Sequence, residues 1–163
     1  MYKKEEDKII RKKIRRGKYV TIKPNKNFYN FYKKLKIYFK NNEMSKYQID
    51  LVERSKDQYY TFGTSVRWSQ YEIKIFEENT CCIEFLPHKD GIELYWLEIF
   101  QRGKGFGTTF MNAFKQIAEE LNIKIYLIPA PLNHDYQVDP QRRRDFYHRF
   151  NFKRMEDSRY WVN

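Results

Sequence analysis

Residues 92–121, IELYWLEIFQRGKGFGTTFMNAFKQIAEEL, determine the fold expected for this chain. The β-prone run 92–100 predicts a strand, and a glycine-rich turn over 101–107 follows it. Apolar residues then recur at spacings of three and four, which predicts a helix that ends near Asn122. The first amides of such a helix have no intrahelical acceptor, and the helix dipole adds positive potential there. The stretch therefore predicts an anion site at the start of the helix.

The surrounding sequence predicts an α+β domain. Two β-rich runs at 71–77 and 81–86 precede the strand and are separated from it and from each other by short turns, which predicts an antiparallel meander. The pattern over 44–56 fits either a short helix or a strand. The other expected elements are a solvated helix over 3–16, a strand over 19–22, an amphipathic helix over 27–40, a strand over 123–128, a loop over 129–141, a helix over 142–150 with Asn151 in a left-handed conformation, and a strand over 153–162.

Length and composition fit one domain with a basic arm. The 163 residues are 41% hydrophobic and 18% aromatic, which excludes a mostly disordered chain. The net charge of +11 is concentrated in residues 1–42, which carry +12, whereas residues 43–163 carry −1. We therefore expect an arm over 1–18, which would bind nucleic acid or an acidic protein, and a single domain over 19–163.

The glycine-rich turn does not fit two common phosphate-binding motifs. A Walker A loop needs four residues between its first glycine and Gly-Lys-Ser/Thr, and the dinucleotide motif needs GxGxxG after a parallel strand. The turn supplies neither spacing. Arg102 and Lys104 add positive charges beside the helix amides.

Two motifs resemble those of the GNAT N-acetyltransferase superfamily. Arg102, Gly105 and Gly107 resemble its loop for the acetyl-CoA pyrophosphate, and the FYHRFNF run over 146–152 resembles an element of its last helix. The resemblance covers roughly residues 70–163 and implies a central mixed, mostly antiparallel sheet flanked by helices. It also implies transfer of an acetyl group from acetyl-CoA to a primary amine, either a protein lysine or N-terminus or a small amine.

The resemblance also implies roles for individual residues. Tyr147 would be the general acid, and Glu93 or Glu98 the general base. Regular strand alternation puts these two glutamates on opposite faces, so only one of them could face the site, and Glu93 is the first choice. The residues expected to bind acetyl-CoA are Leu97, Ile99, Arg102, Gly103, Lys104, Gly105, Phe106, Gly107 and Thr108.

Other interpretations of these residues remain open. Tyr147 fits a core aromatic, and the two glutamates fit solvated strand charges. The three arginines over 142–144 fit either a solvated helix face or a clasp for the 3′-phosphate of the cofactor or for an acidic substrate. A rival function is a module that binds nucleic acid or an acidic partner and keeps a vestigial acyltransferase fold. No metal site or membrane span is expected, and the adjacent cysteines 81 and 82 favour a cytoplasmic protein without structural disulfides.

Overall fold

The computed structural model describes residue 8 and residues 19–55, 60–62, 65–129, 139–155 and 161–163. Apart from Lys8, the helix expected over 3–16 lies outside these residues, and so does most of the loop expected over 129–141.

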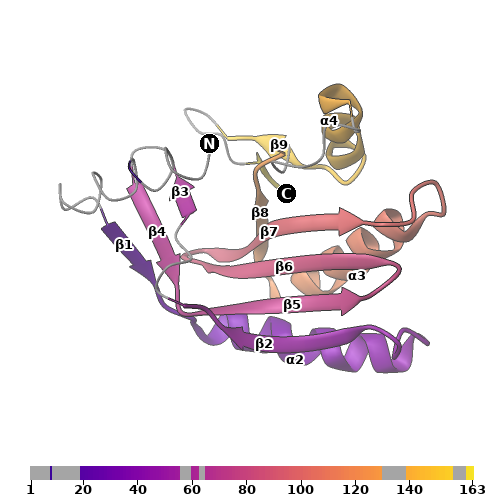
Figure 1. Ribbon diagram of the computed structural model, residues 1–163, viewed down its shortest axis with the longest axis horizontal. Coiled ribbons are helices and arrows are strands. Elements are labelled where there is room, and N and C mark those ends of the chain that lie inside the picture. Colours follow the sequence, from indigo (N-terminus) through magenta and orange to yellow (C-terminus); the bar gives the residue numbers. More distant parts are fainter. Residues whose placement is uncertain (1–7, 9–18, 56–59, 63–64, 130–138, 156–160) are drawn as a thin grey trace.

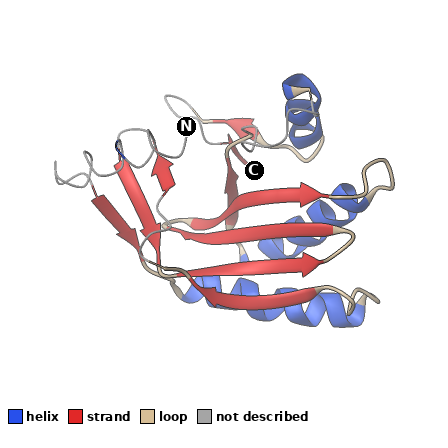
Figure 2. Cartoon of the chain, viewed as in Figure 1, coloured by secondary structure: helices blue, strands red, loops and turns tan. Residues whose placement is uncertain are grey.

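The described residues form a mixed α+β fold with two sheets (Figures 1 and 2). The larger sheet has seven strands, antiparallel except where β7 and β8 run parallel. In sheet order, its strands are β2 (Gln48–Glu53), β5 (Tyr71–Glu77), β6 (Cys81–His88), β7 (Gly91–Ile99), β8 (Lys124–Leu127), β10 (Trp161–Val162) and β9 (Lys153–Arg154). The smaller sheet has the order β1 (Tyr19–Ile22), β4 (Ser65–Ser69) and β3 (Tyr60–Phe62), with β1 parallel to β4.

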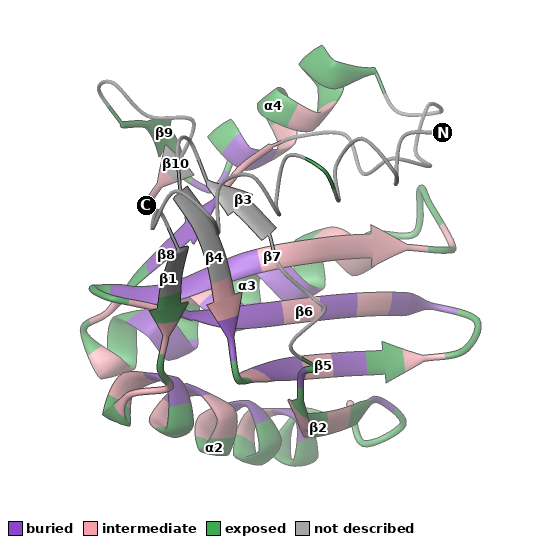
Figure 3. Ribbon diagram, turned by 60° about the vertical axis from the view of Figure 1, so that its left-hand side comes forward, coloured by how far each residue is buried: buried purple, intermediate pink, exposed green. Residues whose placement is uncertain are grey.

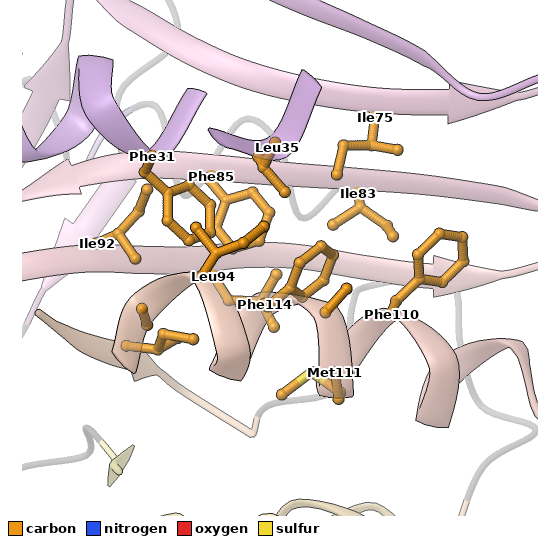
Figure 4. Close-up of a cluster of buried hydrophobic side chains, with 14 of the residues drawn as sticks. Phe31, Leu35, Ile75, Ile83, Phe85, Ile92, Leu94, Phe110, Met111 and Phe114 are labelled. Carbon is orange, nitrogen blue, oxygen red and sulfur yellow. The ribbon is translucent and has the colours of Figure 1, made fainter. Parts of the chain in front are cut away.

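Helices α2 (Lys26–Asn41) and α3 (Phe106–Leu121) lie on the same face of the larger sheet (Figure 1). Their inward residues are buried, whereas the outer side of α2 is largely exposed (Figure 3). Phe31 of α2 and Phe114 of α3 meet Phe85 of β6 edge-on, with ring centroids 5.0 and 4.8 Å from that of Phe85 (Figure 4). This aromatic core fixes α3, and with it the turn that precedes the helix, against the larger sheet.

Most expected elements are confirmed, including the meander, both long helices and the left-handed Asn151, whose φ is 63°. The ambiguous stretch 44–56 contains strand β2. The single strand expected over 153–162 was wrong, because β9 and β10 pair with each other in antiparallel fashion. Strands β3 and β4 were not expected at all.

The last helix, α4 (Pro140–His148), begins and ends earlier than the expected 142–150. The Asp139 side chain accepts a hydrogen bond from the Gln141 backbone N–H, and Pro140 occupies the first turn, where its missing N–H costs no hydrogen bond. The FYHRFNF run anchors the other end: the Tyr147 ring packs edge-on against Phe152, with a centroid separation of 5.9 Å. The helix is therefore held at both ends.

Candidate functional site

A cavity of about 370 Å³ lies between the end of β7, the following turn, the first turn of α3, and α4. This volume falls in the range of small-molecule sites, roughly 300–1,000 Å³. The lining residues are Leu97, Ile99, Gln101, Arg102, Gly103, Gly105, Phe106, Gly107, Thr108, Arg142, Arg143, Phe146, Tyr147 and Arg149.

The cavity lies beyond the point where β7 and β8 stop pairing. Their last register pair is Leu94 with Leu127, after which β8 ends while β7 continues to Ile99. The side chains of Leu97 and Ile99, in this extension of β7, form the apolar wall of the cavity. Because β8 does not cover this segment, its edge next to the cavity has no neighbouring strand among the described residues.

The start of α3 forms the polar floor of the cavity, and no side chain caps it. Its N-cap is Gly105, with φ at 77°, and its first turn carries no acidic residue. Helices α2 and α4 differ, because Asn25 caps α2 and Asp139 caps α4 through side-chain oxygens. Among the helices α2, α3 and α4, only α3 therefore leaves its first amides and its dipole available to an anion.

The three glycines of the turn have different physical roles. Gly103 and Gly105 have φ values of 78° and 77°, a left-handed conformation that side-chain-bearing residues rarely adopt, although a Cβ would meet nothing within 4 Å. Gly107 is needed for space instead: a Cβ there would lie 3.3 Å from the Phe146 ring of α4. The absence of a side chain at Gly107 thus lets α4 approach α3 closely.

Positive charge reaches the cavity from two sides. Arg102 comes from the turn, Arg142 and Arg143 come from α4, and Arg149 is the C-cap residue of that helix. Among the described residues that line the cavity, none is acidic. Arg144 is not a lining residue, and its guanidinium donates to the Gln141 side chain at 3.1 Å.

Lys104 was expected to bind the cofactor, but it does not line the cavity. Its Nζ donates to Oε1 of Gln101 at 3.1 Å. Because this lysine is two residues from Arg102 on the same turn, its charge still adds to the local positive potential.

Tyr147 lies at the inner side of the cavity and is buried. Burial raises the pKa of its phenol to about 12, opposed by the nearby positive charge of Arg143. The phenol is therefore protonated at neutral pH and is chemically suited to donate a proton or a hydrogen bond. It belongs both to the lining of the cavity and to the hydrophobic core.

The expectation that Glu93 and Glu98 lie on opposite faces was wrong. The register between β6 and β7 shifts, with Tyr95 as an extra residue in β7. A β-bulge of this kind reverses the alternation beyond it. Glu93 is paired with Leu86 and Glu98 with Cys82, and these two residues share a face of β6. Both glutamates therefore lie on the sheet face away from α2 and α3.

Neither glutamate lines the cavity. Glu93 is 3% exposed and is paired with Tyr126 of β8, immediately before the last pair of the two strands. Glu98 is half-buried farther along β7, and its carboxylate accepts a hydrogen bond from the Trp96 indole at 3.2 Å. Of the two, Glu93 is nearer to the point where β7 and β8 separate.

The helical spacing of Arg142, Phe146 and Arg149, four and then three residues, places them on one side of α4. This spacing was available in the sequence, but Arg149 was not selected from it. The expectation grouped Arg144 with its neighbours instead, although a helix turns that residue away from them. The other expected cofactor-binding residues, apart from Lys104, all line the cavity.

Within the described ranges, no group of three or more His, Cys, Asp or Glu residues could hold a metal ion. Cys81 is buried in the core, where burial raises the pKa of its thiol to about 12, and Cys82 on the other face is half-buried; both thiols are free. No described helix combines the length and the apolar character needed to cross a membrane.

Comparisons with known proteins give no family assignment. No protein-family profile matches the chain, and no curated protein matches it. Among solved structures, the anti-CRISPR protein AcrVA5 is similar to 56% of this chain and 97% of its own, with 20% sequence identity and a TM-score of 0.49.

Proposed function

We propose that this protein is an acetyltransferase that moves an acetyl group from acetyl-CoA to a primary amine. The observation that carries the proposal is one cavity in which an uncapped helix start, four arginines and a protonated tyrosine meet. These groups come from segments far apart in the sequence, the turn after β7 and helix α4.

The proposed fold is that of the GNAT superfamily. Three features support it: the antiparallel meander β5–β6–β7, the parallel pair β7–β8 that separates beyond Leu94, and the glycine-rich turn that leads from β7 into α3. The β-bulge at Tyr95 lies at the same point of separation. The sequence motifs of the two cavity walls, around Arg102 and Tyr147, add independent support.

The lining residues fit the chemistry of coenzyme A. Its diphosphate would bind the amides of Phe106, Gly107 and Thr108 together with Arg102, because anions are stabilised at a helix start. The pantetheine arm is extended and mostly apolar, and it would lie along Leu97 and Ile99. Its amides would hydrogen-bond to the β7 edge that β8 leaves uncovered.

The reaction needs a neutral amine, a polarised carbonyl and a proton for the departing sulfur. Glu93 would accept a proton from the amine, directly or through water, and the amine nitrogen would attack the thioester carbonyl carbon. The new C–N bond replaces the C–S bond, and Tyr147 would donate its proton to the leaving thiolate. The nearby charge of Arg143 would stabilise the resulting phenolate until solvent returns the proton.

Calorimetry with acetyl-CoA and with CoA tests the binding step. We expect Arg102→Ala to weaken binding by about tenfold, the effect of losing one charge-assisted hydrogen bond. Lys104→Ala is the matched control, because this neighbouring cation does not line the cavity, and it should change affinity much less. The proposal fails if wild-type protein binds neither ligand at millimolar concentration.

The acceptor is tested by incubating the protein with isotopically labelled acetyl-CoA and pools of peptides, proteins and small amines, followed by mass spectrometry. Label on amine nitrogen that depends on active protein supports transfer. Glu93→Gln should lower this transfer more than Glu98→Gln, since Glu93 is nearer to the separation of β7 and β8. Equal, full activity in both variants would remove the glutamates from the mechanism.

A second candidate function is that of a binding module for nucleic acid or an acidic partner, in which the acyltransferase fold is vestigial. It is favoured by α2, whose 16 residues include five lysines and no acid, with Lys26, Lys33, Lys36 and Lys40 exposed. The basic residues of 1–18 add to this charge. Salt-dependent DNA or RNA binding that is lost on deleting residues 1–18, without any acetyl transfer, would favour this candidate.

A further inference from the structure

The arginines of α4 exceed what a diphosphate at the α3 start requires. Arg102 and the α3 amides already form one anion site on one side of the cavity. Arg142 and Arg143 of α4 and its C-cap residue Arg149 stand at the other side, and none of the described residues that line the cavity is acidic. Four positive charges therefore face a single ligand, which implies a ligand with more than one phosphate group.

The three α4 arginines are not equivalent. Arg143 is half-buried, and its charge acts on the phenol of Tyr147, so it belongs to the inner end of the cavity. Arg142 and Arg149 are exposed and belong to its mouth. They are seven residues apart, which is about 10 Å along a helix. Two cations spaced in this way can contact one phosphate from opposite sides.

The position of Arg149 is also restricted by packing. Its guanidinium lies 5.4 Å from the centroid of the Phe146 ring, in cation–π geometry. Phe146 itself packs against Gly107 of α3. This contact gives the guanidinium a preferred position at the mouth of the cavity, which reduces the conformational entropy lost on binding a phosphate.

Coenzyme A carries a second phosphate group that matches this arrangement. It has roughly four negative charges at neutral pH, about two on the diphosphate and about two on the 3′-phosphate. We infer that Arg142 and Arg149 recognise the 3′-phosphate, so that the protein selects free CoA thioesters over ligands that lack this group. This inference rests on the proposed function, because it assigns a subsite within the same cavity.

The test compares CoA with 3′-dephospho-CoA by calorimetry on the full chain. Wild-type protein should bind CoA about tenfold or more tightly than dephospho-CoA, as for the loss of one charge-assisted contact. The double variant Arg142→Ala/Arg149→Ala should lose most of this preference. Its affinity for dephospho-CoA should stay close to the wild-type value, because the removed side chains contact the missing group.

Arg144→Ala is the matched control, since this exposed arginine lies on the same helix but outside the cavity. It should keep the wild-type preference, and thermal unfolding of each variant checks that α4 is intact. Equal wild-type affinity for both ligands overturns the inference while the proposed function stands. The inference is also overturned, while the proposed function stands, if Arg144→Ala loses as much of the preference for CoA as the double variant does. In that case the net charge of α4 alone explains the preference. Failure to bind either ligand overturns the proposed function and the subsite together.

Discussion

At the residue scale, the proposed function assigns its most specific chemical role to Tyr147. We expect Tyr147→Phe to lower kcat by roughly 100-fold, at the lower end of the range for loss of a general acid. The affinity for CoA, measured by calorimetry, should hardly change, because the ring that packs against Phe152 remains. Turnover is measured as release of the CoA thiol with the acceptor that the labelling identifies.

Tyr32→Phe serves as the control, since this half-buried tyrosine of α2 does not line the cavity. A Tyr147→Phe variant with the wild-type kcat would show that the phenol takes no part in the proposed reaction. A large loss of CoA affinity would instead assign Tyr147 to binding.

Glu84 of β6 gives a pH-dependent prediction away from the cavity. Its pKa is raised above the usual value by burial first and then by the charge of Glu72, against the opposing charges of Lys74 and Arg54. The folded state therefore holds this proton more tightly than the unfolded state. Stability falls as pH rises from the unfolded pKa through the folded pKa. The raised pKa of Glu84 thus makes the fold less stable at neutral pH than at acidic pH.

We expect Glu84→Gln to be more stable than wild type at pH 7, because glutamine resembles the protonated acid. At pH 4, below both pKa values, the difference should largely disappear. Urea unfolding at the two pH values measures this, with Glu78→Gln in an exposed turn as the control. A Glu84→Gln protein that is less stable at pH 7 would contradict the assigned direction.

At the element scale, the uncapped start of α3 implies a trade-off between stability and binding. Thr108 is an exposed residue in the first turn of α3 and lines the cavity. Thr108→Glu should stabilise the helix by about 0.3–1 kcal/mol, because a negative charge there interacts favourably with the helix dipole. The same charge would repel the ligand phosphates, so CoA affinity should fall by about tenfold or more.

Thermal unfolding and calorimetry measure the two effects, and Thr108→Gln separates charge from size. If Thr108→Glu binds CoA as well as Thr108→Gln does, the start of α3 is not the anion site.

Most elements could be predicted locally, because their periodicity and end residues lie within one short stretch. The apolar spacing of α2 and α3 and the alternation of β5 predicted their type and nearly their bounds. Strands β9 and β10 were merged in the prediction, since nothing in the local pattern distinguishes one long strand from two that pair together. The bulge at Tyr95 was missed because it depends on the register with β6.

At the scale of the whole molecule, the proposed ligand joins β7, α3 and α4. A ligand that binds only the folded state stabilises it by about 2.7 kcal/mol at a concentration 100 times its Kd. For a chain of this size, that corresponds to a rise in Tm of roughly 5–10 °C. We expect acetyl-CoA to give such a shift in differential scanning fluorimetry.

The double variant Arg142→Ala/Arg149→Ala should show a smaller shift at the same ligand concentration, because its Kd is higher. AMP, which carries one phosphate and no pantetheine, is the control ligand and should shift Tm little. A Tm that acetyl-CoA leaves unchanged at saturating concentration would contradict binding to the folded state.

The sequence alone determined most of the elements and the glycine-rich turn, because helix and strand periodicity and the conformational demands of Gly103 and Gly105 act over a few residues. The tertiary structure decided which side chains meet. It brought Arg149 to the cavity, left Arg144 and Lys104 outside, and put Glu93 and Glu98 on one face. The position of the arginines depends on how Phe146 of α4 packs on Gly107, and the face of the two glutamates depends on the register between β6 and β7. Both are tertiary contacts, which the local sequence pattern does not encode.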